Sequence, residues 1–135
     1  MTVSKNLSRL SRWPLLVGYC LFLYFGCTLP GEQLPEVVTQ ANDKVLHFLD
    51  FFLLALLSFR TFILSSLSFF HVKAGRKAAL FSLLYGFLLE WAQRSVPGRD
   101  ASFWDGMADA LGVLVASGVF RISRLPRRGY PDPLK

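Results

Sequence analysis

Four apolar runs are the feature of this 135-residue sequence that most restricts what it can fold into. They occupy residues 13–29, 45–59, 78–92 and 105–120. Because a helix rises about 1.5 Å per residue, about 20 apolar residues cross the roughly 30 Å hydrocarbon core of a bilayer. Each run approaches that length once its flanking residues are included. We therefore predict an all-α fold in which four transmembrane helices form a bundle.

The composition favours lipid over water as the surroundings of these runs. Hydrophobic residues make up 53% of the chain and charged residues only 18%, whereas about a quarter of a soluble domain is charged. A chain this apolar is not intrinsically disordered. Cys20 and Cys27 lie inside the first run, which excludes a disulfide-rich secreted scaffold and favours a packing role for both side chains.

The basic residues predict the orientation. With a cytoplasmic N-terminus, most Lys and Arg residues fall on the cytoplasmic side, as the positive-inside rule requires. These residues are Lys5, Arg9, Arg12, Lys73, Arg76, Lys77, Arg121, Arg124, Arg127, Arg128 and Lys135. Lys44, Arg94 and Arg99 fall on the opposite side. The net charge of +6 is therefore a topology signal, and we expect no nucleic-acid partner because the basic residues are divided among short segments.

The same topology predicts a single membrane domain with both termini in the cytoplasm. We expect a basic N-terminus at residues 1–12, the four-span domain at residues 13–121 and a cytoplasmic tail at residues 122–135. Arg60 follows Lys44 by about 24 Å along the second helix, which places it near the cytoplasmic interface, where its side chain can reach water. Residues 62–70 either lengthen that helix or lie along the inner interface, and both alternatives stay open.

Polar residues gather at the outer ends of the last three spans. They are Asp43, Lys44, His47 and Asp50 in the second span, Glu90 and Gln93 in the third, Arg99 and Asp100 in the following loop, and Asp105 and Asp109 in the fourth. Counted inward, His47, Glu90 and Asp109 all lie about one helical turn below the outer interface. Ionisable groups at that depth normally face the interior of a bundle or a water-filled cleft. We therefore predict a site there.

The predicted ligand-binding residues are Asp43, Lys44, His47, Glu90, Gln93, Arg99, Asp105 and Asp109. Acids outnumber bases on this side of the membrane, and such crowding is relieved by protonation or by recruiting a cation. Carboxylates and one imidazole suit a divalent cation, for which the candidate ligands are His47, Glu90, Asp105 and Asp109. We also expect Gly106, Gly112 and Gly118 to let the fourth helix pack closely on a neighbour.

These motifs resemble the VanZ-like family of small bacterial membrane proteins. The family pattern combines Asp-Lys-x-x-His, Glu-x-x-Gln, an Arg and Asp-x-x-x-Asn-x-x-Gly. The chain has Asp43-Lys44-Val45-Leu46-His47, Glu90-Trp91-Ala92-Gln93, Arg99 and Asp105-Gly106-Met107-Ala108-Asp109-Ala110-Leu111-Gly112, so that the match covers residues 43–112. It departs at Asp109, where the family usually has Asn, a neutral donor and acceptor.

The resemblance implies a four-span protein in the inner membrane of a bacterium, within the cell envelope. It links the chain to glycopeptide resistance only through the family, which is named after a member associated with resistance to teicoplanin. We expect an outward-facing acidic pocket that binds a polar or cationic ligand, such as a lipid head group or a lipid-linked cell-wall precursor. This hypothesis favours a binding protein over an enzyme.

Two other functions stay open. The first is a membrane enzyme acting on a lipid-linked phosphate, with Glu90 or His47 as general base and Arg99 positioning the phosphate. The second is a small proton-coupled transporter, which would require a homo-oligomer, although the acids crowd one end of the spans and do not cross the midplane. A purely structural role, in which polar residues only lock helix ends together, is the remaining alternative.

Overall fold

The computed structural model describes residues 12–33, 42–99 and 102–123. Within those ranges all regular structure is helical, which confirms the predicted all-α class. The long helices are α2 (Arg12–Thr28), α4 (Asp43–Ile63), α6 (Ala74–Gln93) and α7 (Phe103–Ser123), and the short elements are η1 (Gly31–Gln33) and α5 (Ser68–His71). The predicted N-terminal segment up to residue 11, the loop residue Asp100 and the tail from residue 124 lie outside the described residues.

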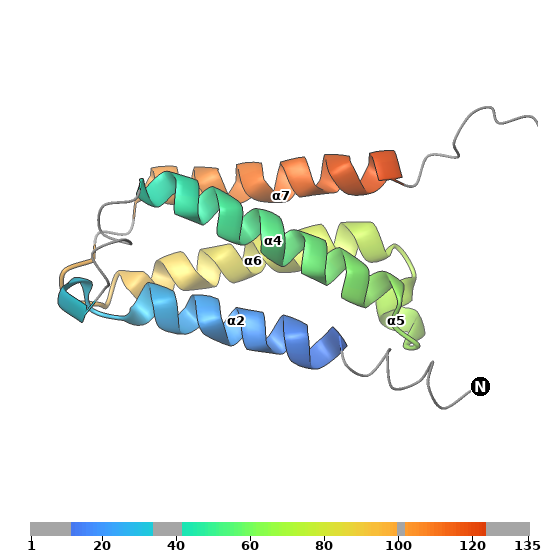
Figure 1. The fold of residues 1–135 in the computed structure, drawn as a ribbon, viewed down its shortest axis with the longest axis horizontal. Helices are drawn as coiled ribbons and strands as arrows, with labels where there is room; N and C mark the ends of the chain where they lie inside the picture. Colours follow the sequence, from blue (N-terminus) through green and yellow to red (C-terminus); the bar gives the residue numbers. More distant parts are fainter. Residues whose placement is uncertain (1–11, 34–41, 100–101, 124–135) are drawn as a thin grey trace, which may run out of the picture.

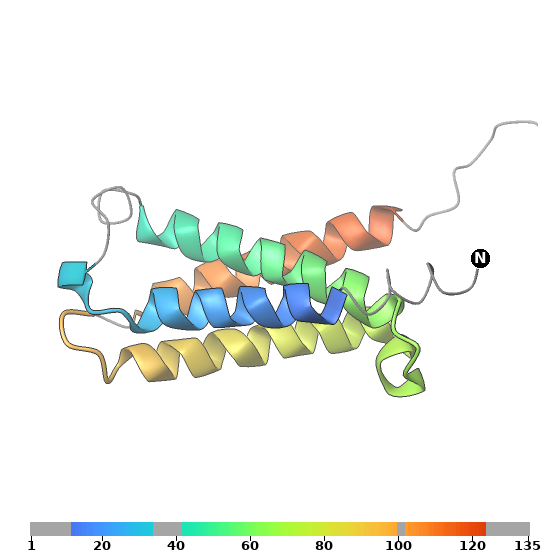
Figure 2. The same ribbon diagram turned by 60° about the horizontal axis from the view of Figure 1, so that its bottom comes forward.

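Successive long helices run in opposite directions and lie side by side (Figures 1 and 2). Helix α4 is central, because it packs most extensively on α7 and also contacts α6 and α2. The N-terminal ends of α4 and α7 therefore meet the C-terminal ends of α2 and α6 (Figure 1). We call this the acidic end, defined by Asp43, Glu90, Asp105 and Asp109. The opposite, basic end is defined by Arg12, Lys73, Arg76, Lys77 and Arg121.

The start of α4 is fixed by a side-chain cap. Asn42 precedes the helix in an extended conformation, and its side chain accepts a hydrogen bond from the backbone N–H of Lys44. This bond satisfies one of the donors that a helix N-terminus leaves free, and Asp43 in the first turn adds a favourable charge there. The cap thus sets the register of Asp43, Lys44 and His47 on the helix.

Helix α4 ends at Ile63, so the alternative of a continuous helix through residues 62–70 is wrong. Ser65 competes with the helix, because its hydroxyl accepts the backbone N–H of Leu67 in a local turn. The chain then turns back through α5. There the Phe70 ring packs edge-on against Trp13, with ring centroids 4.9 Å apart, and tilted against Phe62, with centroids 4.8 Å apart. This aromatic cluster joins α5 to α2 and α4.

Burial is distributed in a way that suggests association with a membrane. The core contains Phe51, Leu54 and Phe59, but polar residues such as Ser58 and Ser82 are also buried. Large apolar side chains face outward on the other helices, including Phe22 (64% exposed), Phe87 (72%) and Leu114 (68%). Soluble monomers rarely expose apolar surface on this scale. Helices α4 and α7 are the two described helices that are long and apolar enough to cross a membrane, by length and composition.

Only one of the three glycines expected to allow close packing in α7 does so. A Cβ atom on Gly112 would lie 2.4 Å from the carbonyl oxygen of Phe48 and 2.9 Å from the backbone nitrogen of Phe52, so α7 touches the backbone of α4 at this point. A Cβ atom on Gly106 or Gly118 would meet nothing within 4 Å. The prediction is therefore confirmed for Gly112 and wrong for the other two, because those two face away from the contact.

Candidate functional site

The centre of the acidic end is formed by His47, Glu90 and Asp109, one residue from each of α4, α6 and α7. One ligating atom from each of these residues lies within 4.8 Å of the other two. His47 Nδ1 is 2.9 Å from Asp109 Oδ1 and 3.8 Å from Glu90 Oε1. Because a carboxylate only accepts hydrogen bonds, the ring N–H at Nδ1 donates to Asp109. The three residues predicted to lie at matching depth are thus in contact range.

Two carboxylate oxygens at this centre have no hydrogen-bond partner among the described residues. They are Asp109 Oδ2 and Glu90 Oε1, and both atoms are buried. The Asp109 side chain is only 5% exposed and that of Glu90 only 13%. A buried acceptor left without a donor costs about 1–3 kcal/mol, and more when it is charged. The centre therefore has unused capacity to accept hydrogen bonds or to coordinate a cation.

The rim of the site comes from the first turns of α4 and α7. Asp43 Oδ1 lies 3.9 Å from His47 Nε2, and Lys44 Nζ lies 3.4 Å from Asp105 Oδ1. Asp105 is buried, whereas Asp43 and Lys44 are exposed. Asp43, His47 and Asp105 also form a second group whose ligating atoms lie within 4.8 Å of one another. His47 therefore lies between two groups of acids, one buried and one partly open.

Close helix packing creates the space for these groups. A Cβ atom on Gly86 would lie 2.9 Å from Phe51 Cε1 and 3.1 Å from Asp109 Oδ2, so a larger residue would crowd the free oxygen. Gly86 precedes Glu90 by four residues on the same face of α6. The sequence patterns did not single out Gly86 as a residue of the site, although a glycine one turn before a buried acid indicates close helix packing there. Gln93, the next predicted residue along α6, is buried at the same end.

Arg99 and Asp50 are directed toward α2. The guanidinium of Arg99 donates from Nη2 to the carbonyl oxygen of Gly26 at 2.8 Å. That carbonyl is in the last turn of α2, where helix carbonyls lack intrahelical partners and favour a nearby cation. Asp50 accepts a hydrogen bond from the Tyr19 hydroxyl at 3.2 Å. Both contacts join α2 to the rest of the protein. No pattern in the sequence indicated the role of Tyr19.

The arrangement has the chemistry of a cation-binding site. Carboxylate oxygens and one imidazole approach a common point, and a divalent cation at ligand distances of about 2.0–2.6 Å would take the place of the proton on His47 Nδ1. An ammonium group could instead donate hydrogen bonds to the two free oxygens. The donor set therefore fits a metal ion or an organic cation. No protein-family model, curated protein or solved structure matches this chain.

Proposed function

We propose that this chain is a VanZ-like integral membrane protein that binds a cationic group at its acidic end. In this proposal α2, α4, α6 and α7 form a transmembrane four-helix bundle in the inner membrane of a bacterium, with both termini in the cytoplasm. The acidic end faces outward. The ligand is a divalent cation or the ammonium group of a lipid head group or lipid-linked cell-wall precursor.

The proposed membrane topology is supported by the distribution of charge along the helices. Lys73, Arg76 and Lys77 precede or begin α6, and Arg121 is in the last turn of α7, so all four lie at the basic end. The positive-inside rule assigns such an end to the cytoplasm. The apolar faces between the two ends, which carry side chains such as Phe87 and Leu114, would then contact lipid.

The observation that carries the proposed binding function is the pair of unpartnered oxygens, Asp109 Oδ2 and Glu90 Oε1, beside His47. Three helices bring acids together in a buried place, where like charges repel unless a positive charge joins them. A bound cation supplies that charge and satisfies both free acceptors. Arg99, the residue expected to position a phosphate, donates from Nη2 to the Gly26 carbonyl of α2, while its buried Nε–H has no partner among the described residues.

The test uses the purified protein in detergent and follows thermal unfolding by tryptophan fluorescence. The probes are Mg²⁺, Mn²⁺, Zn²⁺ and phosphoethanolamine, each added over a range of concentrations. A ligand that binds only the folded state stabilises it by about 2.7 kcal/mol at 100 times its Kd. We expect at least one probe to raise the unfolding temperature of the wild-type protein.

The decisive variant is Glu90→Gln, which removes one charge with little change of shape. Glu32→Gln is the matched control, because Glu32 is exposed in η1. We expect stabilisation by the probe to be lost in Glu90→Gln and kept in Glu32→Gln. The proposal fails if no probe stabilises the wild type, or if Glu90→Gln responds as the wild type does.

A further inference from the structure

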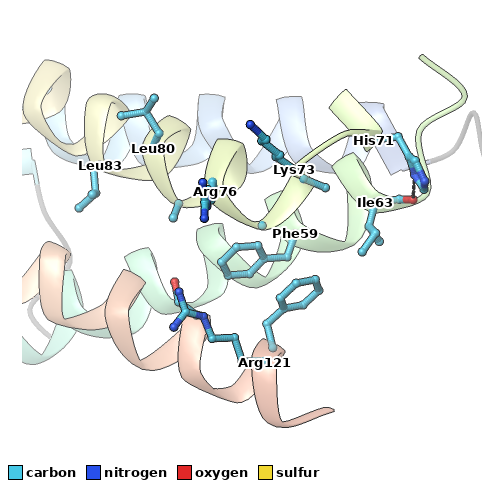
Figure 3. A pocket seen from close by; sticks show the side chains of 13 residues that line it. Phe59, Ile63, His71, Lys73, Arg76, Leu80, Leu83 and Arg121 are labelled. Carbon is cyan, nitrogen blue, oxygen red and sulfur yellow. Dashed lines mark hydrogen bonds between the residues drawn. The ribbon is translucent and has the colours of Figure 1, made fainter. Parts of the chain in front are cut away.

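A second recess lies at the basic end, away from the acidic site. It has a volume of about 800 Å³, which is within the range of small-molecule sites. Figure 3 shows it between α6 and α7, with α4 behind. Its lining also includes His71 of α5 and Lys73 of the turn that leads into α6. Four separate elements therefore contribute to it.

The lining combines an apolar wall with a cationic rim. Ile63, Leu80 and Leu83 supply apolar surface, and Lys73, Arg76 and Arg121 supply positive charge. Figure 3 shows Arg76 on α6 and Arg121 on α7 on opposite sides of Phe59. None of the described residues that line it is acidic. This pairing of surfaces is complementary to an amphiphile that has an anionic head and a hydrocarbon chain.

The three rim cations are available to a ligand. Within the described ranges none of Lys73, Arg76 and Arg121 forms an ion pair. The neighbouring Lys77 differs, because its ammonium group donates to the carbonyl oxygen of Phe69 and lies 4.0 Å from the centre of that ring. Cations that line one recess without acidic partners repel one another, so an anion beside them is favourable.

The turn before α6 holds one of these cations in an unusual conformation. Lys73 has φ 54° and ψ 35°, and it is the one non-glycine residue with positive φ in the described part of the chain. A left-handed conformation costs a residue with a side chain about 1–2 kcal/mol. Lys73 keeps this conformation at the rim of the recess. Nearby, His71 donates from Nδ1 to the carbonyl oxygen of Ile63 at 2.8 Å. That bond fixes the turn against the end of α4.

We propose that this recess binds one anionic phospholipid, with its phosphate between Arg76 and Arg121 and its acyl chains along Ile63, Leu80 and Leu83. Arg side chains bind phosphate through paired N–H groups, and basic recesses between helices on the cytoplasmic side suit anionic head groups. The inference rests on the proposed membrane insertion, but it is independent of cation binding at the acidic end.

The experiment measures lipid retained by the purified full chain in native mass spectrometry. The protein is exchanged into micelles that contain equal amounts of phosphatidylglycerol and phosphatidylcholine. We expect one phosphatidylglycerol to be retained with a preference of roughly tenfold or more over phosphatidylcholine. In the double variant Arg76→Gln/Arg121→Gln that preference is lost.

The control double variant Arg12→Gln/Arg60→Gln removes two positive charges from α2 and α4 outside the recess, and it keeps the preference. If both double variants lose the preference for phosphatidylglycerol equally, the proposal is overturned, because the lipid would then be attracted by the overall positive charge of the basic end. Equal retention of both lipids, or displacement of the lipid by inorganic phosphate at millimolar concentration, would overturn it as well. Glu90→Gln keeps the lipid preference, so failure at the acidic end and failure at the recess are distinguishable.

Discussion

Replacing Gly112 by alanine tests whether the contact between α4 and α7 builds the candidate site. The new Cβ atom would lie 2.4 Å from the Phe48 carbonyl oxygen, about 1 Å short of an ordinary contact of 3.4 Å. The three nearest atoms, which are Phe48 O, Phe48 C and Phe52 N, all belong to the backbone of α4, so no side chain can rotate away. The two helices must therefore separate locally by about 1 Å.

That separation acts on the site because the clash is next to it. Gly112 follows Asp109 by one turn of α7, and Phe48 follows His47 directly. Adding about 1 Å to the 2.9 Å contact between His47 Nδ1 and Asp109 Oδ1 takes it beyond hydrogen-bonding distance. Overpacking costs about 1–3 kcal/mol, and losing a hydrogen bond to a charged group costs about 1.5–3 kcal/mol. The higher helix propensity of alanine offsets up to about 1 kcal/mol of this loss of stability. We expect a net loss of about 1.5–5 kcal/mol.

Reversible unfolding in mixed detergent and SDS micelles measures this loss. Gly118→Ala is the matched control, because it makes the same chemical change on the same helix and its Cβ atom would meet nothing within 4 Å. We expect Gly118→Ala to be neutral or stabilising by up to about 1 kcal/mol. If Gly112→Ala is as stable as Gly118→Ala and still binds the cation probe, our reading of the helix contact and of its role in the site is refuted.

Two further predictions concern other parts of the structure. Tyr19→Phe removes the hydroxyl that donates to the half-buried Asp50, and it should destabilise the protein by about 1–3 kcal/mol in the same unfolding assay. The control Tyr24→Phe changes an exposed tyrosine and should leave the stability unchanged. Equal effects of the two substitutions would contradict the assigned hydrogen bond. Variants with a single tryptophan, placed in vesicles of brominated lipid, report which side chain contacts lipid through quenching of its fluorescence. The fluorescence of Trp91 (67% exposed) should be quenched more strongly than that of the packed Trp13. Unquenched Trp91 fluorescence would contradict a lipid-facing α6.

Apolar run length and helix geometry were sufficient to predict the all-α fold from the sequence. The second predicted helix begins at Asp43 in the structure as well. Helix α6 extends beyond its apolar run at the basic end, because Arg76 and Lys77 continue the helix without being apolar. Counting residues inward from the outer helix ends also predicted that His47, Glu90 and Asp109 lie at the same depth. This count works because the rise per residue of a helix is the same whatever the helix packs against.

Which partner each polar group has was decided by the tertiary structure alone. Asp50 pairs with Tyr19, 31 residues away, and Arg99 pairs with Gly26, 73 residues away. Such contacts depend on how each helix is rotated about its axis and on how closely neighbours approach, as at Gly112, and local sequence fixes neither. The sequence by itself determined that the chain forms helices, that the second predicted helix begins at Asp43, and that acidic residues lie at one depth among the helices. Only the packing of α4 against α6 and α7 left Asp109 Oδ2 and Glu90 Oε1 buried without partners, because that depends on three helix surfaces at once.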